Sequence, residues 1–235
     1  DLLMTGDPDT AVTPSGSARL FANLHGVLTN SGFVLPGLSK SAAVWFDYDN
    51  DGDLDLLLAG QFGASAATAL TKLFRNDNNG AFVEVPTALP GVTECSVAVC
   101  DYNHDGWLDL ALAGLNTSSN RIAGLFRNLG NGTFTNDNIL LPGVSRGIIA
   151  WGDYDNDGWA DLVLTGLTNG LAASAITRVF HTDAGVSFTD TGTPLPGIFD
   201  HSAVWGDFDN DGDLDLVLGA RIFRNIVNPP TSPPN

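Results

Sequence analysis

Short apolar runs separated by polar, glycine-rich turns recur along the whole chain. In one stretch the apolar segments 41–46, 54–59, 71–76 and 81–85 each have the length of a short strand. The densest run, 54–59, has the composition of a strand that is buried on both faces. No segment shows the 3.6-residue apolar period of an amphipathic helix. The pattern predicts an all-β protein built from units of about four strands.

Three markers repeat in a fixed order and define the unit. The first is a nine-residue acidic loop, Asp-x-Asp/Asn-x-Asp-Gly-x-x-Asp, and its copies start at Asp47, Asp101, Asp153 and Asp207, which are 54, 52 and 54 residues apart. Eleven residues before each start lies the proline of a Leu-Pro-Gly, at Pro36, Pro90, Pro142 and Pro196. The third marker is Leu-Phe-Arg-Asn at 73–76 and 125–128, with a looser copy at 179–182. Four-stranded units in series are typical of a β-propeller, and a parallel β-helix, which usually has shorter rungs, is the competing solenoid.

We therefore predict a β-propeller of four-stranded antiparallel blades, with four full repeats plus partial blades at both ends. The predicted domain spans 1–225, with repeats at about 1–60, 61–114, 115–166 and 167–220, a partial repeat at 221–225, and a Pro-rich tail or linker at 226–235. Residues 1–35 supply three strands without a first, and residues 201–225 supply three without a fourth. Three explanations fit these incomplete sets of strands. The chain is a fragment of a longer protein, it closes on itself as a ring, or its ends complete the blades of a neighbouring subunit.

The charge is strongly negative and concentrated in the loops. Lys and Arg total 10 against 27 Asp and Glu, for a net charge of −17, and 17 of the 25 Asp lie in the four loops. This balance argues against nucleic acid and against an anionic membrane surface, since both require clustered cations. No apolar run approaches the roughly 18 residues of a membrane span. Cys95 and Cys100 fall on opposite faces of one predicted strand, so we expect two free thiols.

The acidic loop has the chemistry of a calcium site. Side-chain oxygens stand at positions 1, 3, 5 and 9, a glycine at position 6 permits a sharp turn, and position 7 offers its backbone carbonyl. An all-oxygen set of irregular geometry suits Ca²⁺ better than Mg²⁺. An EF-hand needs Glu at position 12, whereas every copy here carries Leu there. We expect about four structural Ca²⁺ ions, each adding +2 and together bringing −17 to −9, with the weakest site in the second loop, where Asn103 replaces a carboxylate.

The loop pattern, once per predicted blade, resembles the FG-GAP/VCBS repeat family over about residues 1–225. The resemblance implies a fold similar to the integrin α-subunit propeller, and the family also includes lectins. Carried over by position, the implied metal ligands are Asp47, Asp49, Asp51, Asp53 (carbonyl), Asp55, Asp101, Asn103, Asp105, Trp107 (carbonyl), Asp109, Asp153, Asp155, Asp157, Trp159 (carbonyl), Asp161, Asp207, Asp209, Asp211, Asp213 (carbonyl) and Asp215.

Several aromatic and polar residues lie outside this ligand set. Trp45, Trp151 and Trp205 each stand two residues before a loop, a placement that favours packing between blades. Trp107 and Trp159 lie inside loops and are candidate ligand contacts. Asn116 and Asn131 begin Asn-x-Thr/Ser sequons in predicted surface loops and are candidate glycosylation sites of a glycoprotein.

The sequence carries no nucleophile–base pair, phosphate-binding glycine loop or transition-metal cluster, so we do not expect an enzyme. We expect a secreted or cell-surface, calcium-stabilised scaffold for adhesion or structure, which binds protein partners or assembles into a filament or array by completing blades between subunits. The alternatives are a carbohydrate-binding, lectin-type propeller with glycan partners, and a non-catalytic fragment of a larger secreted protein.

Overall fold

The computed structural model describes residues 1–6, 17–63, 65–77 and 82–225. In this part of the chain the regular structure is β-strand, apart from two short 3-10 turns, η1 (Ala66–Thr68) and η2 (Ala172–Ser174). The strands are β1 (Leu2–Gly6), β2 (Ser17–Leu24), β3 (Val27–Asn30), β4 (Ser39–Phe46), β5 (Asp55–Gln61), β6 (Ala69–Asn76), β7 (Phe82–Val85), β8 (Val92–Cys100), β9 (Asp109–Asn116), β10 (Arg121–Asn128), β11 (Phe134–Asn136), β12 (Ile149–Gly152), β13 (Asp161–Leu167), β14 (Ala175–Asp183), β15 (Ser187–Asp190), β16 (Ala203–Gly206), β17 (Asp215–Leu218) and β18 (Arg221–Phe223).

Consecutive strands pair antiparallel in five groups. The groups β1–β3 and β16–β18 have three strands, and β4–β7, β8–β11 and β12–β15 have four. A single residue pair, Leu70 with Val92, joins β4–β7 and β8–β11 into an eight-stranded sheet. This pairing confirms the all-β prediction and is incompatible with a parallel β-helix. Within the described strands no sheet closes on itself, and the last group does not pair with the first.

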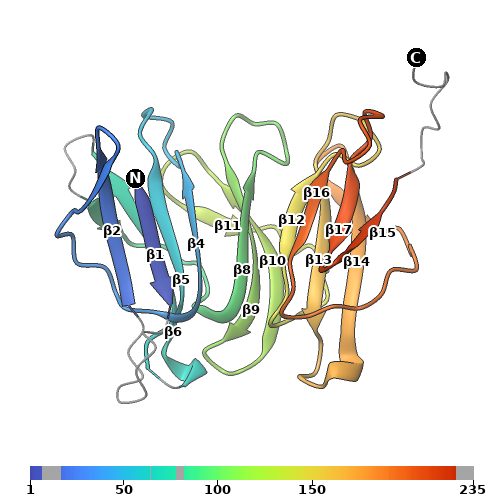
Figure 1. Cartoon of the computed structure of the whole chain (residues 1–235), viewed down its shortest axis with the longest axis horizontal. Helices are drawn as coiled ribbons and strands as arrows, with labels where there is room; N and C mark the ends of the chain where they lie inside the picture. The colour runs from blue at the N-terminus through green and yellow to red at the C-terminus, as the bar shows by residue number, and fades with distance from the viewer. Residues whose placement is uncertain (7–16, 64, 78–81, 226–235) are drawn as a thin grey trace.

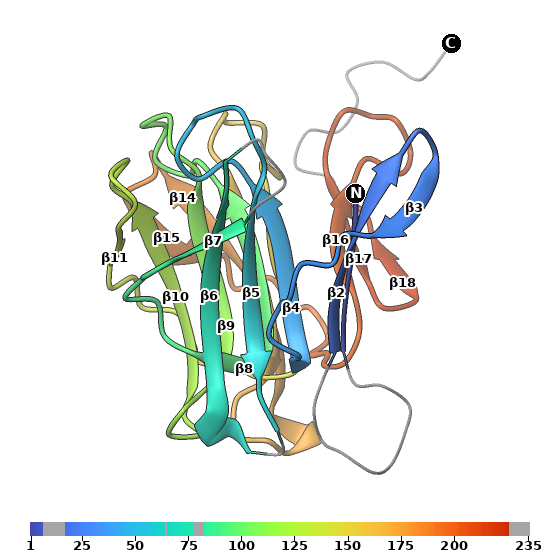
Figure 2. The ribbon, with the colours of Figure 1, turned by 90° about the vertical axis from the view of Figure 1, so that its left-hand side faces the viewer.

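The five groups follow an arc. Figure 1 shows the chain running along the long axis from the blue strands β1 and β2 on the left, through the green β8 and β9, to the orange and red β14, β15 and β17 on the right. Figure 2, turned by 90°, shows the first and last groups on the same side of the molecule. The first strand of each group lies against the first strand of the next group. Thus β1 contacts β4, β4 contacts β8, β8 contacts β12 and β12 contacts β16. This arrangement brings the acidic loops to one end of neighbouring strands.

Core clusters lie between consecutive groups, and the second strand of a group contributes to two of them. Leu56 and Leu58 of β5 pack with residues of β1–β3, whereas Leu57 and Ala59 pack with β9. In β9, Leu110 and Leu112 face β5, and Ala111 faces β13. All seven residues of β5 and of β13 are buried. The dense apolar runs of the sequence are therefore strands covered on both faces, as predicted.

The Leu-Pro-Gly motif follows the last strand of a group, and its backbone packs closely against the third strand of the same group. A Cβ added at Gly91 would lie 2.3 Å from the Ala69 carbonyl oxygen, and one at Gly143 would lie 2.2 Å from that of Arg121. The Thr71 hydroxyl donates to the Pro90 carbonyl at 2.8 Å. Only glycine allows this backbone contact, which explains its recurrence.

The strand predictions agree with the structure to within two residues. The segments 41–46, 54–59 and 71–76 correspond to β4, β5 and β6, and β7 begins at Phe82, next to a residue outside the described part. The predicted repeat boundaries differ from the boundaries of the groups, because each group begins with the strand before its acidic loop. The predicted repeat 61–114 therefore contains β6 and β7 of one group and β8 and most of β9 of the next. Cys95 and Cys100 are free thiols on β8, as predicted.

The predicted tail at 226–235 lies outside the described residues. Among those described, no helix is long and apolar enough to cross a membrane.

Candidate metal centres

The first aspartate of each loop holds the loop closed. Both carboxylate oxygens of Asp47 accept backbone N–H groups, from Asp51 at 3.1 Å and from Gly52 at 2.9 Å. The same pair of bonds recurs in the other copies, at 2.9–3.1 Å, on Asp101, Asp153 and Asp207. The glycine has a left-handed backbone (φ +93° at Gly52), which explains its fixed place at position 6.

The ninth residue ties the loop to the following strands. Asp55 is fully buried, and its carboxylate accepts the Tyr48 N–H at 2.9 Å and the Asn76 N–H at 2.8 Å. Equivalent paired bonds form at Asp161 and Asp215. Burial raises the pKa of Asp55 and Asp161 to about 6, although the backbone N–H groups oppose the shift. These are dehydrated carboxylates whose charged form is poorly compensated by the protein alone.

In the second loop, the carboxylate at position 9 accepts fewer hydrogen bonds than in the other loops. Asp109 accepts the Asn128 N–H at 2.7 Å, but its other oxygen is buried without a hydrogen-bond partner. Burial raises the pKa of Asp109 to about 7. The neighbouring position 3 is Asn103, which bonds with Asp105 rather than adding a carboxylate to the site.

In the first, third and fourth loops, the aspartate at position 3 has one carboxylate oxygen without a hydrogen-bond partner. Oδ1 of Asp49, Asp155 and Asp209 is shielded from solvent and has no hydrogen-bond partner. Desolvation raises the pKa of Asp49, and the carboxylates of Asp51 and Asp47 add to the effect. An unpaired buried anion is costly, so these oxygens call for a cation.

The predicted ligands converge in three of the four loops. Ligand atoms lie within 4.8 Å of one another in the groups Asp47–Asp49–Asp55, Asp153–Asp155–Asp157 and Asp207–Asp209–Asp215. Among the described residues the second loop forms no such acidic group, because Asn103 replaces its third carboxylate. Converging carboxylates with unpaired buried oxygens fit a divalent ion. The acidic clusters can therefore hold metal.

Position 7 was predicted to supply a backbone carbonyl. The N–H of this residue donates to the position-5 carboxylate in every loop, for example Asp53 to Asp51 at 2.9 Å and Trp159 to Asp157 at 2.8 Å. The other two members of the set, Trp107 and Asp213, donate to Asp105 and Asp211 in the same way. These bonds fix the peptide orientation, and coordination by the carbonyls stays a prediction.

The two loop tryptophans pack against neighbouring turns. The ring of Trp107 lies over Gly130, where a Cβ would come within 2.4 Å of it. The ring of Trp159 stacks on His104 of the preceding loop, with centroids 4.0 Å apart and planes 13° apart. Both are partly exposed, so their predicted contact with a ligand stays open.

The two sequon asparagines lie in tight turns. Oδ1 of Asn116 accepts the N–H groups of Ser118 and Asn120, both at 3.0 Å. Oδ1 of Asn131 accepts the N–H of Thr133 at 3.1 Å as well as its hydroxyl. Glycosylation at either position stays a prediction.

A further residue, which contacts the acidic loop in the third and fourth repeats, received no role from the sequence. It is the third residue of the Leu-Phe-Arg-Asn marker. Arg224 pairs with Asp209 at 2.5 Å and with Asp211 at 3.1 Å. At the same place in the third repeat, His181 Nδ1 lies 3.1 Å from Asp155. The fixed position of this marker after the loop was the available signal.

Three recurring contacts join neighbouring groups, and the first two lie at the loops. The residue at position 4 has a left-handed backbone and reaches the next loop, as when the Asn50 amide donates to the Gly106 carbonyl at 2.9 Å. The tryptophan two residues before a loop stacks on the position-2 tyrosine of the preceding loop, as when Trp151 packs on Tyr102 at 5.7 Å and 12°. Trp205 packs on Tyr154 in the same way. The predicted packing between neighbouring groups is confirmed for Trp151 and Trp205, and Trp45 instead packs on Phe82 and beside the core cluster shared with β2.

The third contact is a row of side chains of alternating charge. They lie at the start of, or just before, the first strands β4, β8, β12 and β16. Its members, all with φ of 47–56°, are Lys40, Glu94, Arg146 and Asp200. Lys40 pairs with Glu94 at 2.8 Å, the Arg146 N–H donates to the Glu94 carbonyl at 2.9 Å, and Arg146 pairs with Asp200. Sequence reasoning missed this row, although its spacing equals the repeat spacing. We name it the junction row.

Comparison with known proteins agrees with the repeats. No curated protein matches this chain in sequence. Among solved structures, a lectin of Agrocybe aegerita, described as recognising non-reducing terminal N-acetylglucosamine, matches with a TM-score of 0.54 and 17% identity over 92% of this chain. The match covers 60% of the lectin, and at this identity it shows a similar fold alone. The model of the FG-GAP-like repeat matches residues 47–112 and 101–164, half of the sequence, and the chain belongs to the FG-GAP-like repeat family.

Proposed function

We propose that this protein is a calcium-stabilised β-propeller scaffold that acts through its surface. The observation that carries the proposal is the set of buried, unpaired oxygens on Asp49, Asp155 and Asp209, each beside other carboxylates of its loop. Oxygen-only sites with irregular geometry favour Ca²⁺. The ion would add positive charge beside these carboxylates, which among the described residues already pair with an arginine only in the fourth loop, with Arg224. Positions 1, 3, 5 and 9 with the position-7 carbonyl would hold it in each of four loops.

The ion's role in this proposal is structural. The ninth aspartate already connects a loop to the next two strands, so neutralising its charge would stabilise three strands at once. Metal that binds the folded state and not the unfolded chain adds to stability by mass action. Millimolar calcium outside cells would keep such sites filled, which supports a secreted or cell-surface location. The same acidic surface supports protein partners rather than nucleic acid, and the proposed role involves no catalysis.

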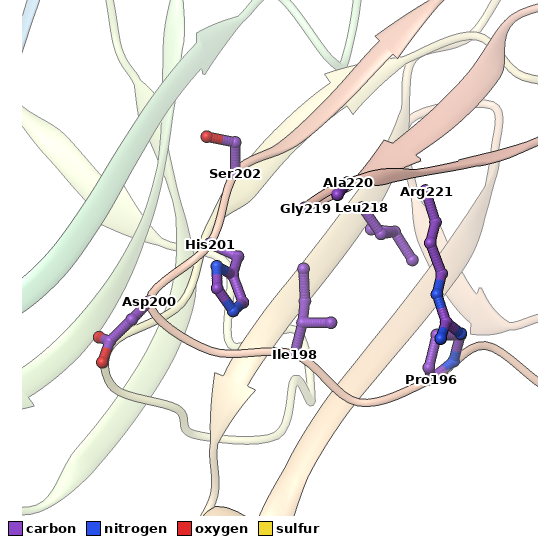
Figure 3. Close-up of a pocket in the computed structure, with 9 residues that line it drawn as sticks. All are labelled: Pro196, Ile198, Asp200, His201, Ser202, Leu218, Gly219, Ala220 and Arg221. Atoms are coloured by element: carbon purple, nitrogen blue, oxygen red, sulfur yellow. The ribbon is translucent and has the colours of Figure 1, made fainter.

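The exposed face of the last group supports assembly with a further sheet. Phe208 stands where Tyr48 and Tyr102 are buried in other loops, yet it is 51% exposed. Asn210 has the left-handed backbone of the residues that reach a next loop, and it is exposed. Beside Asp200, the last member of the junction row, lies a cavity of about 640 Å³, with His201 on one side and Arg221 on the other (Figure 3). A sheet of the same type, carrying a cation for Asp200 and an aromatic ring for Phe208, fits this face.

Two measurements test this scaffold. Calcium titration followed by thermal unfolding should raise the midpoint, and exhaustive chelation should lower it; a midpoint unaffected by either treatment would refute the calcium role. Sedimentation velocity in calcium tests assembly, with Phe208→Asp as the variant and Phe62→Asp as the control, because Phe62 is similarly exposed (55%) but directly follows β5 in another group of strands. Assemblies that survive Phe208→Asp would contradict assembly through this face.

Glycan binding is the second candidate function. A groove of about 340 Å³ is lined by Asn103, Arg127, Asp137 and Val186, a mixture of polar and apolar groups that suits a sugar, while the Tyr102 ring beneath it is buried. The lectin with a similar fold, described as recognising N-acetylglucosamine, supports the test of such ligands. Binding on a glycan array that is lost in Arg127→Ala, or in variants of Trp107 or Trp159, would favour this function over the scaffold. A non-catalytic part of a larger secreted protein is the third candidate, and the mass of the native protein in calcium would distinguish it.

A further inference from the structure

We propose that the third acidic loop forms a mixed nitrogen–oxygen site for a transition-metal ion such as Zn²⁺, with His181, Asp155 and Asp161 as ligands. The inference rests on the proposed function, because Asp155 and Asp161 also belong to the predicted calcium set. It adds His181 to that set and assigns this loop a different metal preference from the other loops.

The three side chains converge from separate parts of one group of strands. His181 lies on β14, Asp161 begins β13, and Asp155 lies in the loop before it. His181 Nδ1 is 3.1 Å from Asp155 Oδ2 and 3.4 Å from Asp161 Oδ1, and a ligand atom from each residue lies within 4.8 Å of the others. Ligands at about 2.0–2.2 Å from a tetrahedral ion are about 3.3–3.6 Å apart. The two spacings from His181 Nδ1 are close to this range, and the two aspartate ligand atoms lie within 4.8 Å of each other.

Two polar atoms of this group are shielded from solvent although the His181 side chain is itself 35% exposed. His181 Nδ1 and Asp155 Oδ1 are both shielded from solvent and have no hydrogen-bond partner, and Asp161 is fully buried. An Nδ1 that faces two carboxylate oxygens must either carry a proton or give its lone pair to a cation between them. A metal ion satisfies all three groups at once.

The same position in the other repeats excludes this chemistry. It is occupied by arginine, which has no lone pair to donate to a metal. Arg224 instead binds two carboxylates of its own loop, whereas Arg75 and Arg127 pair with Asp77 and Asp137 beyond their loops. Because imidazole nitrogen favours Zn²⁺, Cu²⁺ and Ni²⁺ over Ca²⁺, the single histidine changes the preference of this one loop.

Isothermal titration of the full chain with Zn²⁺, in buffer containing excess Ca²⁺, tests the site. We expect one Zn²⁺ site whose affinity falls by at least about tenfold in His181→Arg, the residue that the other repeats carry. His25→Asn is the matched control, since His25 is exposed in a turn with φ of 56°, a conformation that asparagine tolerates. Electron paramagnetic resonance with Cu²⁺ as the probe should show coupling to one imidazole nitrogen in the wild type and lose it in His181→Arg.

The outcome separates this inference from the calcium proposal. Zn²⁺ affinity that is unchanged in His181→Arg, or no Zn²⁺ binding at all, overturns the mixed site even if calcium binds as proposed. His181-dependent Zn²⁺ binding without any calcium stabilisation would support the mixed site and refute the calcium scaffold. Circular dichroism checks folding, and His181→Gln replaces His181→Arg if the arginine variant does not fold.

Discussion

Replacing Asp55 by asparagine tests the link between the loop and the strands that it joins. The aspartate accepts two backbone N–H groups, at 2.9 Å and 2.8 Å, and it is fully buried. An amide of the same size has one acceptor oxygen, so one of these N–H groups loses its partner, at a cost of about 1–3 kcal/mol. Without calcium the substitution also removes a buried charge whose pKa is raised to about 6, and this partly offsets the loss.

With calcium the same substitution removes a ligand, and the loss is larger. At a calcium concentration 100 times the dissociation constant, one filled site adds about 2.7 kcal/mol to the free energy of unfolding. We therefore expect Asp55→Asn to cost about 1–3 kcal/mol in chelator and up to about 2.7 kcal/mol more in calcium.

Urea unfolding followed by tryptophan fluorescence measures both values. The control is Asp53→Asn in the same loop, whose side chain is partly exposed and whose predicted contribution is its backbone carbonyl; its effect should stay within about 0.5 kcal/mol. An equal loss for Asp55→Asn in calcium and in chelator would refute the assignment of this carboxylate as a metal ligand.

Three further predictions concern packing, backbone and pH. Leu57→Ala, in the core between β5 and β9, should lower the free energy of unfolding by about 2–5 kcal/mol, whereas Leu54→Ala, at a residue 56% exposed, should change it by less than about 0.5 kcal/mol in the same urea titration. Gly143→Ala should cost at least about 1–3 kcal/mol in thermal unfolding, because its Cβ would lie 2.2 Å from the Arg121 carbonyl; a neutral result would contradict the close approach. In chelator, the raised pKa of Asp109 means that its contribution to stability is full below about pH 4 and is lost as the pH rises through about 7, so Asp109→Asn should flatten the pH dependence of urea midpoints over this range.

The sequence predicted strands and loops well because both depend on local pattern. The runs at 54–59 and 71–76 are apolar and lie at a fixed distance from a loop, and they became β5 and β6. Glycine at position 6 and the alternating aspartates likewise indicate a tight turn whose carboxylates converge. These features need no knowledge of the angle between sheets.

Contacts between groups of strands could not be predicted in the same way. The alternating residues Lys40 and Glu94 are 54 positions apart, and only the packing of β4 against β8 brings them together. The double backbone contact of Asp55 depends on where β6 ends, and the approach of His181 to Asp155 depends on how β14 lies beside the loop. How far the arc extends depends on small angles between neighbouring sheets, which composition does not encode.

The junction row also limits how such a chain can change its length by recombination. Loss of the repeat that carries Glu94 would bring Lys40 beside Arg146, two like charges in contact, whereas loss of two consecutive repeats would bring Lys40 beside Asp200 and keep every pair opposite in sign. Gains and losses in pairs are therefore electrostatically tolerated, and single ones are penalised at the new boundary.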